Sequence, residues 1–214
     1  MLKTNNIGVG YLRVLMGLTL FGSIYWQVSD RLIHNLFRPS EYFTYFTITS
    51  CLITGAVLVV AGLNVLRKQA ETKFLSLARL TMATSMVIVG VIYNALLADA
   101  APDVRDIGYN WPVVPNLIMH TYMPALVLVE WLVTNTTIKL KLTQAFWVLI
   151  YPLAWLAFSI TRGLIQGWWP YWFIDPQYGI TTQLTWIGVI AGFFTVLSLG
   201  LLPAQRAINR QAKV

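Results

Sequence analysis

The sequence has little charge, a single cysteine and few of the motifs that mark soluble enzymes. Only 11% of its 214 residues are charged, whereas a soluble domain usually carries about 25%. The lone Cys51 excludes an intramolecular disulfide and a cysteine-rich metal site. The chain also lacks an HExxH zinc motif, a GxSxG serine elbow, a phosphate-binding loop and a dinucleotide-binding fingerprint. We therefore expect no metal, no other cofactor and no soluble serine hydrolase.

Long apolar runs occupy most of the chain. Hydrophobic residues make up 57% of it, and each run is close to the roughly 20 residues that cross a bilayer core of about 30 Å. No small-residue cleavage pattern follows the first run, so we expect a retained span rather than a removed signal peptide. The sequence predicts an all-α polytopic membrane protein, with one six-helix transmembrane domain over residues 1–214. The predicted spans are 8–28, 42–66, 76–98, 115–136, 142–162 and 180–202.

The formal net charge of +7 does not indicate nucleic acid, because the basic residues lie in short segments that orient a membrane protein. Ten of them fall on one side of the predicted membrane: Lys3, Arg67, Lys68, Lys73, Arg79, Lys139, Lys141, Arg206, Arg210 and Lys213. Four fall on the other side: Arg31, Arg38, Arg105 and Arg162. Both termini are therefore expected in the cytoplasm.

Three connecting segments fall on the predicted outer side. We expect residues 30–43, DRLIHNLFRPSEYF, to form a short amphipathic helix on the membrane surface. Residues 101–115 have the proline and glycine content of a loop. Residues 166–178, QGWWPYWFIDPQY, place aromatic rings around a proline. This composition suits the headgroup level of a bilayer, where an aromatic ring has an apolar and a wet side.

Polar residues inside predicted spans are costly in hydrocarbon and are functional candidates. The second span carries Thr44, Thr47, Cys51 and Thr54 at spacings that form one helix face. Small residues and threonines are also the normal contents of a seam between membrane helices. On spacing alone, the pattern favours packing.

His120 lies inside the fourth predicted span. It is either a histidine bonded to a nearby carbonyl or a proton-transfer group, and the residues around it leave both interpretations open. Asn116, one turn earlier, could hold the imidazole in one tautomer. Pro124, four residues later, frees the carbonyl of His120 and predicts a kink there.

The second and fourth spans are predicted to run in the same direction. Thr47 and His120 each lie about five residues inside their predicted spans, hence roughly 8 Å below the outer boundary. A hydroxyl and an imidazole at equal depth could form a base-activated nucleophile.

Three charged residues lie near the predicted cytoplasmic ends of their spans. An isolated buried charge is costly, so we expect Glu130 to bond Arg13 or Arg79. A structural ion pair is favoured, and an ion or proton path is the alternative. Arg162 ends the fifth span on the outer side. It either binds an anionic headgroup or carboxylate there or only extends to the interface.

Three stretches of the sequence carry a resemblance to a known family. They are YFTYFTITS at 42–50, NLIMHTYMPALVLVEW at 116–131 and ITRGLIQGWWPYWFIDPQYG at 160–179, and together their order spans about two-thirds of the chain. In these stretches the chain resembles the androgen-induced (AIG/FAR-like) integral membrane hydrolases, especially their bacterial "Pr-six-Pr" branch. It departs from that branch at Cys51, where relatives usually carry Asn, and at Trp169, where the motif usually has Tyr.

The resemblance implies a threonine hydrolase that cleaves fatty acid esters of hydroxy fatty acids within the membrane. The matching nucleophile is Thr47 and the matching base is His120, although Thr44 offers a second threonine nearby. The residues assigned to binding or orienting the substrate are Asn116, Arg162, Trp168 and Tyr171.

Two functional hypotheses follow. In the first, the chain hydrolyses a membrane lipid or amphipathic lipid ester in a bacterial plasma membrane. In the second, it is a non-enzymatic carrier or lipid-binding protein whose coupling site is Glu130 with an arginine. Against a carrier, the sequence has no paired repeat with broken helices at the midplane. The sequence leaves the natural substrate and the oligomeric state open.

Overall fold

The computed structural model describes residues 2–3, 6–100, 103–135 and 138–211. Within these residues, six helices are long and apolar enough to cross a membrane. The all-α, six-helix fold that the sequence predicted is therefore confirmed, and it fits a multi-pass membrane protein. The candidate spans are Ile7–Ile33, Phe46–Leu66, Lys73–Leu97, Val113–Val133, Leu142–Gln166 and Ile180–Asn209. Among the basic residues used to orient the chain, Lys213 lies outside the described residues.

Three of the spans combine helical segments of different pitch. The first two spans are the α-helices α1 (Ile7–Ile33) and α3 (Phe46–Leu66). The third is α4 (Lys73–Ile92) followed by a π-helical turn, Tyr93–Leu97. The fourth is α5 (Val113–Leu117), a π-helical turn at Ile118–Tyr122 and α6 (Met123–Val133). The fifth is a 3-10 segment (Leu142–Leu149) and α7 (Ile150–Gln166), and the sixth is α8 (Ile180–Gln211).

Short elements join or extend the spans. On the predicted outer side they are α2 (Pro39–Tyr42) and the 3-10 turns Val104–Asp106, Trp172–Ile174 and Pro176–Tyr178. At the other end, the two-residue strands β1 (Leu2–Lys3) and β2 (Thr134–Asn135) pair in parallel.

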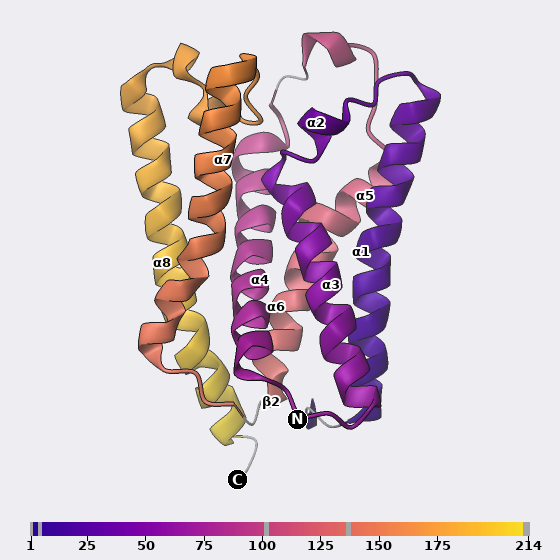
Figure 1. Cartoon of the computed structure of the whole chain (residues 1–214), viewed down its shortest axis with the longest axis vertical. Coiled ribbons are helices and arrows are strands. Elements are labelled where there is room, and N and C mark those ends of the chain that lie inside the picture. Colours follow the sequence, from indigo (N-terminus) through magenta and orange to yellow (C-terminus); the bar gives the residue numbers. More distant parts are fainter. Residues whose placement is uncertain (1, 4–5, 101–102, 136–137, 212–214) are drawn as a thin grey trace.

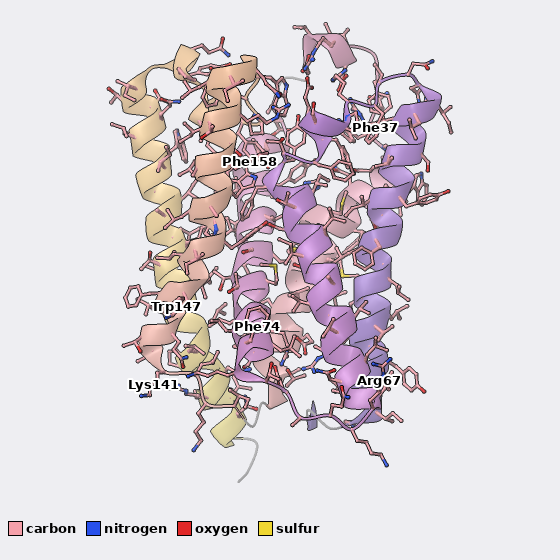
Figure 2. The ribbon with its side chains drawn as sticks, in the orientation of Figure 1. Phe37, Arg67, Phe74, Lys141, Trp147 and Phe158 are labelled. Carbon is pink, nitrogen blue, oxygen red and sulfur yellow. The ribbon has the colours of Figure 1, made fainter. Side chains whose placement is uncertain are left out.

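The helices form a bundle with α1 and α3 on one side, α4 and α6 in the middle, and α7 and α8 on the opposite side (Figure 1). The beginning of the chain at β1 and the last turns of α8 lie at the same end of the bundle. Figure 2 shows Arg67 and Lys141 at that same end, and Phe37 at the opposite end. Residues that the sequence analysis assigned to opposite sides of the membrane are thus at opposite ends of the bundle.

Glycines seven residues apart bring α1 and α3 into close contact. A Cβ atom at Gly17 would lie 2.6 Å from the carbonyl oxygen of Gly55, and one at Gly62 would lie 2.6 Å from that of Gly10. Only glycine permits backbones to approach this closely, which is how small residues stabilise pairs of membrane helices. The seven-residue spacing keeps the contact on one face along both helices.

The second span begins later than the sequence predicted. Pro39 starts the separate helix α2, and Tyr45 leaves the helical backbone region (ψ 131°) before α3 begins at Phe46. Thr44 is therefore in the turn before α3, where its hydroxyl donates to the carbonyl of Ser40 (2.7 Å). The prediction that Thr44 shares a helix face with Thr47 was wrong.

The segment at 30–43 also differs from the surface helix that was expected. Its first residues continue α1 to Ile33, and only Pro39–Tyr42 forms a separate helix. An ion-paired cluster holds this region against the loop after the third span. Arg31 and Arg38 both bond Asp106, at 2.9 and 2.6 Å.

Candidate active site

The amino end of α3 positions Thr47, which is buried. The first amides of a helix have no partner within the helix, and here the Phe46 amide donates to the hydroxyl of Tyr171 (3.0 Å). The same hydroxyl interacts with the amide and side chain of Thr47. The structure thus brings together two residues that lie in separate stretches of the family resemblance.

Thr47 lies in the wall of an apolar, partly open cavity of about 130 Å³, which we call the Thr47 cavity. Its walls come from the start of α3, the end of the third span, α7, α8 and residues 166–178, which we call the aromatic loop. The lining includes Thr47, Tyr93, Trp155, Tyr171, Phe173 and Phe194. A concave site with few polar groups among apolar walls is typical of small-ligand binding. In a bilayer, this site suits hydrocarbon.

His120 is held in the π-helical turn of the fourth span. Its Nδ1 is 2.9 Å from the carbonyl oxygen of Asn116. Since a carbonyl can only accept, Nδ1 carries the proton and Nε2 has a free lone pair. The imidazole also stacks on Tyr93, with ring centroids 3.7 Å apart. His120 therefore has the tautomer and the fixed ring that a general base at Nε2 requires.

The backbone of Asn116 orients His120, while its side chain has another role. The side-chain amide donates to the hydroxyl of Tyr93 (2.7 Å), the ring on which His120 stacks. Asn116 was expected to fix the imidazole tautomer, but any residue at this position would supply the same carbonyl. The Asn116 side chain acts on the histidine through Tyr93.

The carbonyl of His120 is free of a regular helix bond, as expected from Pro124. It accepts a hydrogen bond from the side chain of Asn94 instead. The Asn94 amide donates both to this carbonyl (3.2 Å) and to that of Gly90 (2.7 Å). Gly90 also leaves room for the proline ring, since a Cβ there would lie 2.9 Å from Cβ of Pro124. Asn94 was not predicted from the sequence, although a side-chain amide inside an apolar span is itself a signal.

Thr47 and His120 are not joined by a hydrogen bond in the part of the chain that the structure describes. Tyr93 connects them indirectly, because it lines the Thr47 cavity and stacks on the imidazole. The residue counts behind the predicted equal depth differ in the structure. Thr47 is the second residue of α3, whereas His120 is the eighth residue of its span, Val113–Val133. Apo geometry of this kind does not exclude a catalytic pair, because such bonds often tighten only with substrate.

Arg162 and Trp168 form a separate group near the end of α7. Gly167 ends α7 in a left-handed conformation (φ 69°), which turns the chain back along the helix. Trp168 then lies 4.8 Å from the Arg162 guanidinium, and the ring of Trp169 packs where a Cβ of Gly163 would be. Neither Arg162 nor Trp168 is among the residues that line the Thr47 cavity.

Glu130 bonds both arginines, where the sequence predicted one. Its Oε1 accepts from Nε of Arg13 and from Nη2 of Arg79, each at 2.7 Å. Thr134 adds a hydroxyl at 3.2 Å, and Arg79 also bonds Glu71 at 2.9 Å. Two buried cations are thus matched by two carboxylates. This balance favours a structural role, and Glu71 is the member that sequence analysis missed.

The fold and these contacts define the chain as a multi-pass helical membrane protein with buried polar side chains between its helices. Within the described residues, no group of three or more His, Cys, Asp or Glu side chains could hold a metal. No family model, curated protein or solved structure matches the chain. The resemblance to the androgen-induced hydrolases therefore stays a prediction.

Proposed function

We propose that this protein is an intramembrane lipid ester hydrolase of the androgen-induced type, with Thr47 as nucleophile and His120 as base. The observation that carries the proposal is the position of Thr47 at a helix amino end, in the wall of an apolar cavity. The same cavity is also lined by Tyr93, which stacks on His120. Hydroxyl, base and a hydrocarbon-binding space thus belong to one region.

In the proposed reaction, the Thr47 hydroxyl attacks the ester carbonyl while its proton passes to Nε2 of His120. In the proposal a bound water relays this proton from the hydroxyl to Nε2, because the imidazole itself is held by Asn116 and Tyr93. The imidazolium then gives the proton to the departing alcohol oxygen as the ester C–O bond breaks. Water attacks the resulting acyl-threonine, His120 takes a proton from it, and the acid leaves as Thr47 regains its hydroxyl proton.

The amino end of α3 and Tyr171 would stabilise the oxyanion. A helix amino end presents backbone amides and a partial positive charge, and both favour a developing negative charge. Burial raises the pKa of Tyr171 above its usual value, so this hydroxyl keeps its proton at neutral pH and can donate it in a hydrogen bond. Asn116 is not the oxyanion donor in this scheme, because its amide bonds Tyr93.

The proposed substrate is a membrane lipid or an amphipathic lipid ester. The support is the apolar lining of the Thr47 cavity, much of which comes from α7 and α8. Both helices also expose large apolar side chains such as Leu153 and Leu184, which would face lipid. In the proposal the protein lies in a bacterial plasma membrane with both termini in the cytoplasm.

The test is hydrolysis of a series of long-chain p-nitrophenyl esters by the purified protein, together with labelling by a fluorophosphonate probe. Thr47→Ala and His120→Ala should each abolish turnover, and the double variant should cost little more, because the two groups act as a unit. Thr54→Ala is the matched control, because it removes another buried hydroxyl of α3, one that has no hydrogen-bond partner among the described residues. Full activity in Thr47→Ala would rule out the mechanism. A folded wild type that neither turns over nor labels would favour the carrier hypothesis.

A further inference from the structure

A second concave site lies between α2 and α7, near the outer end of the bundle. It is a partly open groove of about 650 Å³, which we call the Arg162 groove. Its lining includes Pro39, Ser40 and Phe43 from one side and Phe158, Arg162 and Ile165 from the other. None of these residues lines the Thr47 cavity, so the groove is a site of its own.

Arg162 is the cation of this groove, and its side chain is not satisfied by protein atoms. The residue is only 8% exposed, yet its Nη1 has no hydrogen-bond partner among the described residues. Its Nη2 has only a long bond, 3.4 Å, to the hydroxyl of Ser40. The guanidinium also lies 4.8 Å from the ring of Trp168. Burying a charged guanidinium without hydrogen-bond partners costs free energy unless an anion binds it.

The other buried arginines of this chain show what Arg162 lacks. Arg13 and Arg79 share the carboxylate of Glu130, and Arg31 bonds that of Asp106. In the described part of the chain, no carboxylate forms an ion pair with Arg162. The contrast indicates that the anion for Arg162 comes from outside the chain.

We propose that the Arg162 groove binds the headgroup of an anionic amphiphile, with a carboxylate or phosphate on Arg162 and its hydrocarbon chain along α7. The guanidinium suits either headgroup, because its N–H groups pair with two oxygens at once. Phe158 and Ile165 lie about one turn on either side of Arg162 and are 54% and 77% exposed, so they offer apolar surface for the chain. The Ser40 hydroxyl supplies a further donor at the same end. This site does not depend on hydrolysis at Thr47.

The test is equilibrium binding of radiolabelled palmitate to the full chain in uncharged maltoside micelles. Palmitate and hexadecyl phosphate should bind, and hexadecanol should bind at least about tenfold more weakly, since it cannot form the charge-assisted bonds. Arg162→Gln should weaken palmitate binding by about tenfold or more. The control is Lys139→Gln, which removes an exposed cation elsewhere and should leave binding unchanged. Equal binding of palmitate and hexadecanol would overturn the proposal.

Two further measurements complete the test. One distinguishes an amphiphile from a free anion, and the other replaces Arg162→Gln if that variant does not fold. Inorganic phosphate at millimolar concentration should not displace palmitate; displacement would mean that the groove takes a free anion and not an amphiphile. If Arg162→Gln does not fold, Ile165→Trp keeps the cation and fills the exposed wall of the groove. It should weaken palmitate binding, and unchanged binding in this variant would place the hydrocarbon chain elsewhere and refute the assignment.

Discussion

At the scale of single residues, the amino end of α3 brings the groups of the proposed reaction close together. The hydroxyl of Tyr171 meets the Phe46 amide and interacts with Thr47. One phenol from the aromatic loop therefore accepts from the first amide of α3 and lines the same cavity as the proposed nucleophile. The two roles can be separated by removing the hydroxyl and keeping the ring.

Tyr171→Phe is expected to lower kcat by about 100-fold, the usual cost of losing one oxyanion donor, with a small change in KM. The ring stacks on Phe173 at 5.1 Å, so its packing is retained in the variant. Ester hydrolysis and thermal unfolding should be measured on the same preparation. An unaltered kcat would remove Tyr171 from the proposed oxyanion site.

Glu130→Gln is expected to destabilise the protein, because it removes the negative charge that bonds both Arg13 and Arg79, and Glu71 forms its ion pair with Arg79. Breaking a buried ion pair in this way costs about 3–5 kcal/mol. The midpoint of thermal unfolding in detergent reports the effect. Asp99→Asn, which neutralises an exposed carboxylate, serves as control. Unchanged stability of Glu130→Gln with lost transport activity would instead favour the carrier.

At the scale of elements, the backbones of α1 and α3 approach each other closely at their glycines. Gly17→Val should disrupt it, since its Cβ would lie 2.6 Å from a carbonyl oxygen of α3. Overpacking typically costs about 1–3 kcal/mol, and here the clashing atom is backbone, which cannot rotate away. Gly22→Ala is the matched control on the same helix, because no atom of the part of the chain that the structure describes lies within 4 Å of its added Cβ. Thermal unfolding of both variants gives the comparison; equal midpoints would contradict the seam.

The sequence predicted the existence of all six spans more reliably than their ends. Length and apolar content decide whether a segment can cross a bilayer, and six segments met that condition. The start of α3 depends on how the turn at Tyr45 packs, which apolar content does not encode. For this reason Thr47 was placed five residues inside a helix and is in fact its second residue.

The candidate site was predictable only in part, for a related reason. His120 and Pro124 stood out because each is unusual inside an apolar span. Their contacts with Tyr93 and Asn94 depend on which spans are neighbours. Two π-helical turns also alter which side chains face each other, and a regular helical period does not predict them.

At the scale of the whole molecule, the bundle has a basic end and an opposite end whose connecting segments are joined by ion pairs among Arg38, Glu41, Asp103 and Arg105, which we call the ion-paired end. In a variant with Cys51→Ala, a cysteine at the exposed position Gln69 should resist an impermeant maleimide added outside intact cells. A cysteine at the exposed position Ile107 should react. This follows from the excess of Lys and Arg on the side of the 67–73 turn. Reaction from outside at position 69 would reverse the proposed orientation.

The ion-paired end should respond to acid. Arg105, which bonds Asp103, holds the pKa of that carboxyl well below its usual range. A lowered pKa stabilises the fold above the unfolded value of about 3.9, and this stabilisation is lost as the pH falls towards the folded value. Wild type should therefore unfold at a higher temperature than Asp103→Asn at pH 6, with the gap shrinking as the pH falls from about 4 to 2. A gap independent of pH would exclude the carboxylate. The effect should be small, because both side chains are partly exposed.

The π-helical turn at Ile118–Tyr122 determines how α5 is rotated about the helix axis relative to α6. Such a turn is an α-helix with one residue inserted, and each residue of an α-helix advances the chain by about 100°. Deleting one residue of this turn would restore a regular helix and rotate α5 by about that angle relative to α6. Asn116 would then point away from Tyr93, while the composition of the span would hardly change. The geometry around the imidazole is therefore encoded in the number of residues in the span as well as in their identity.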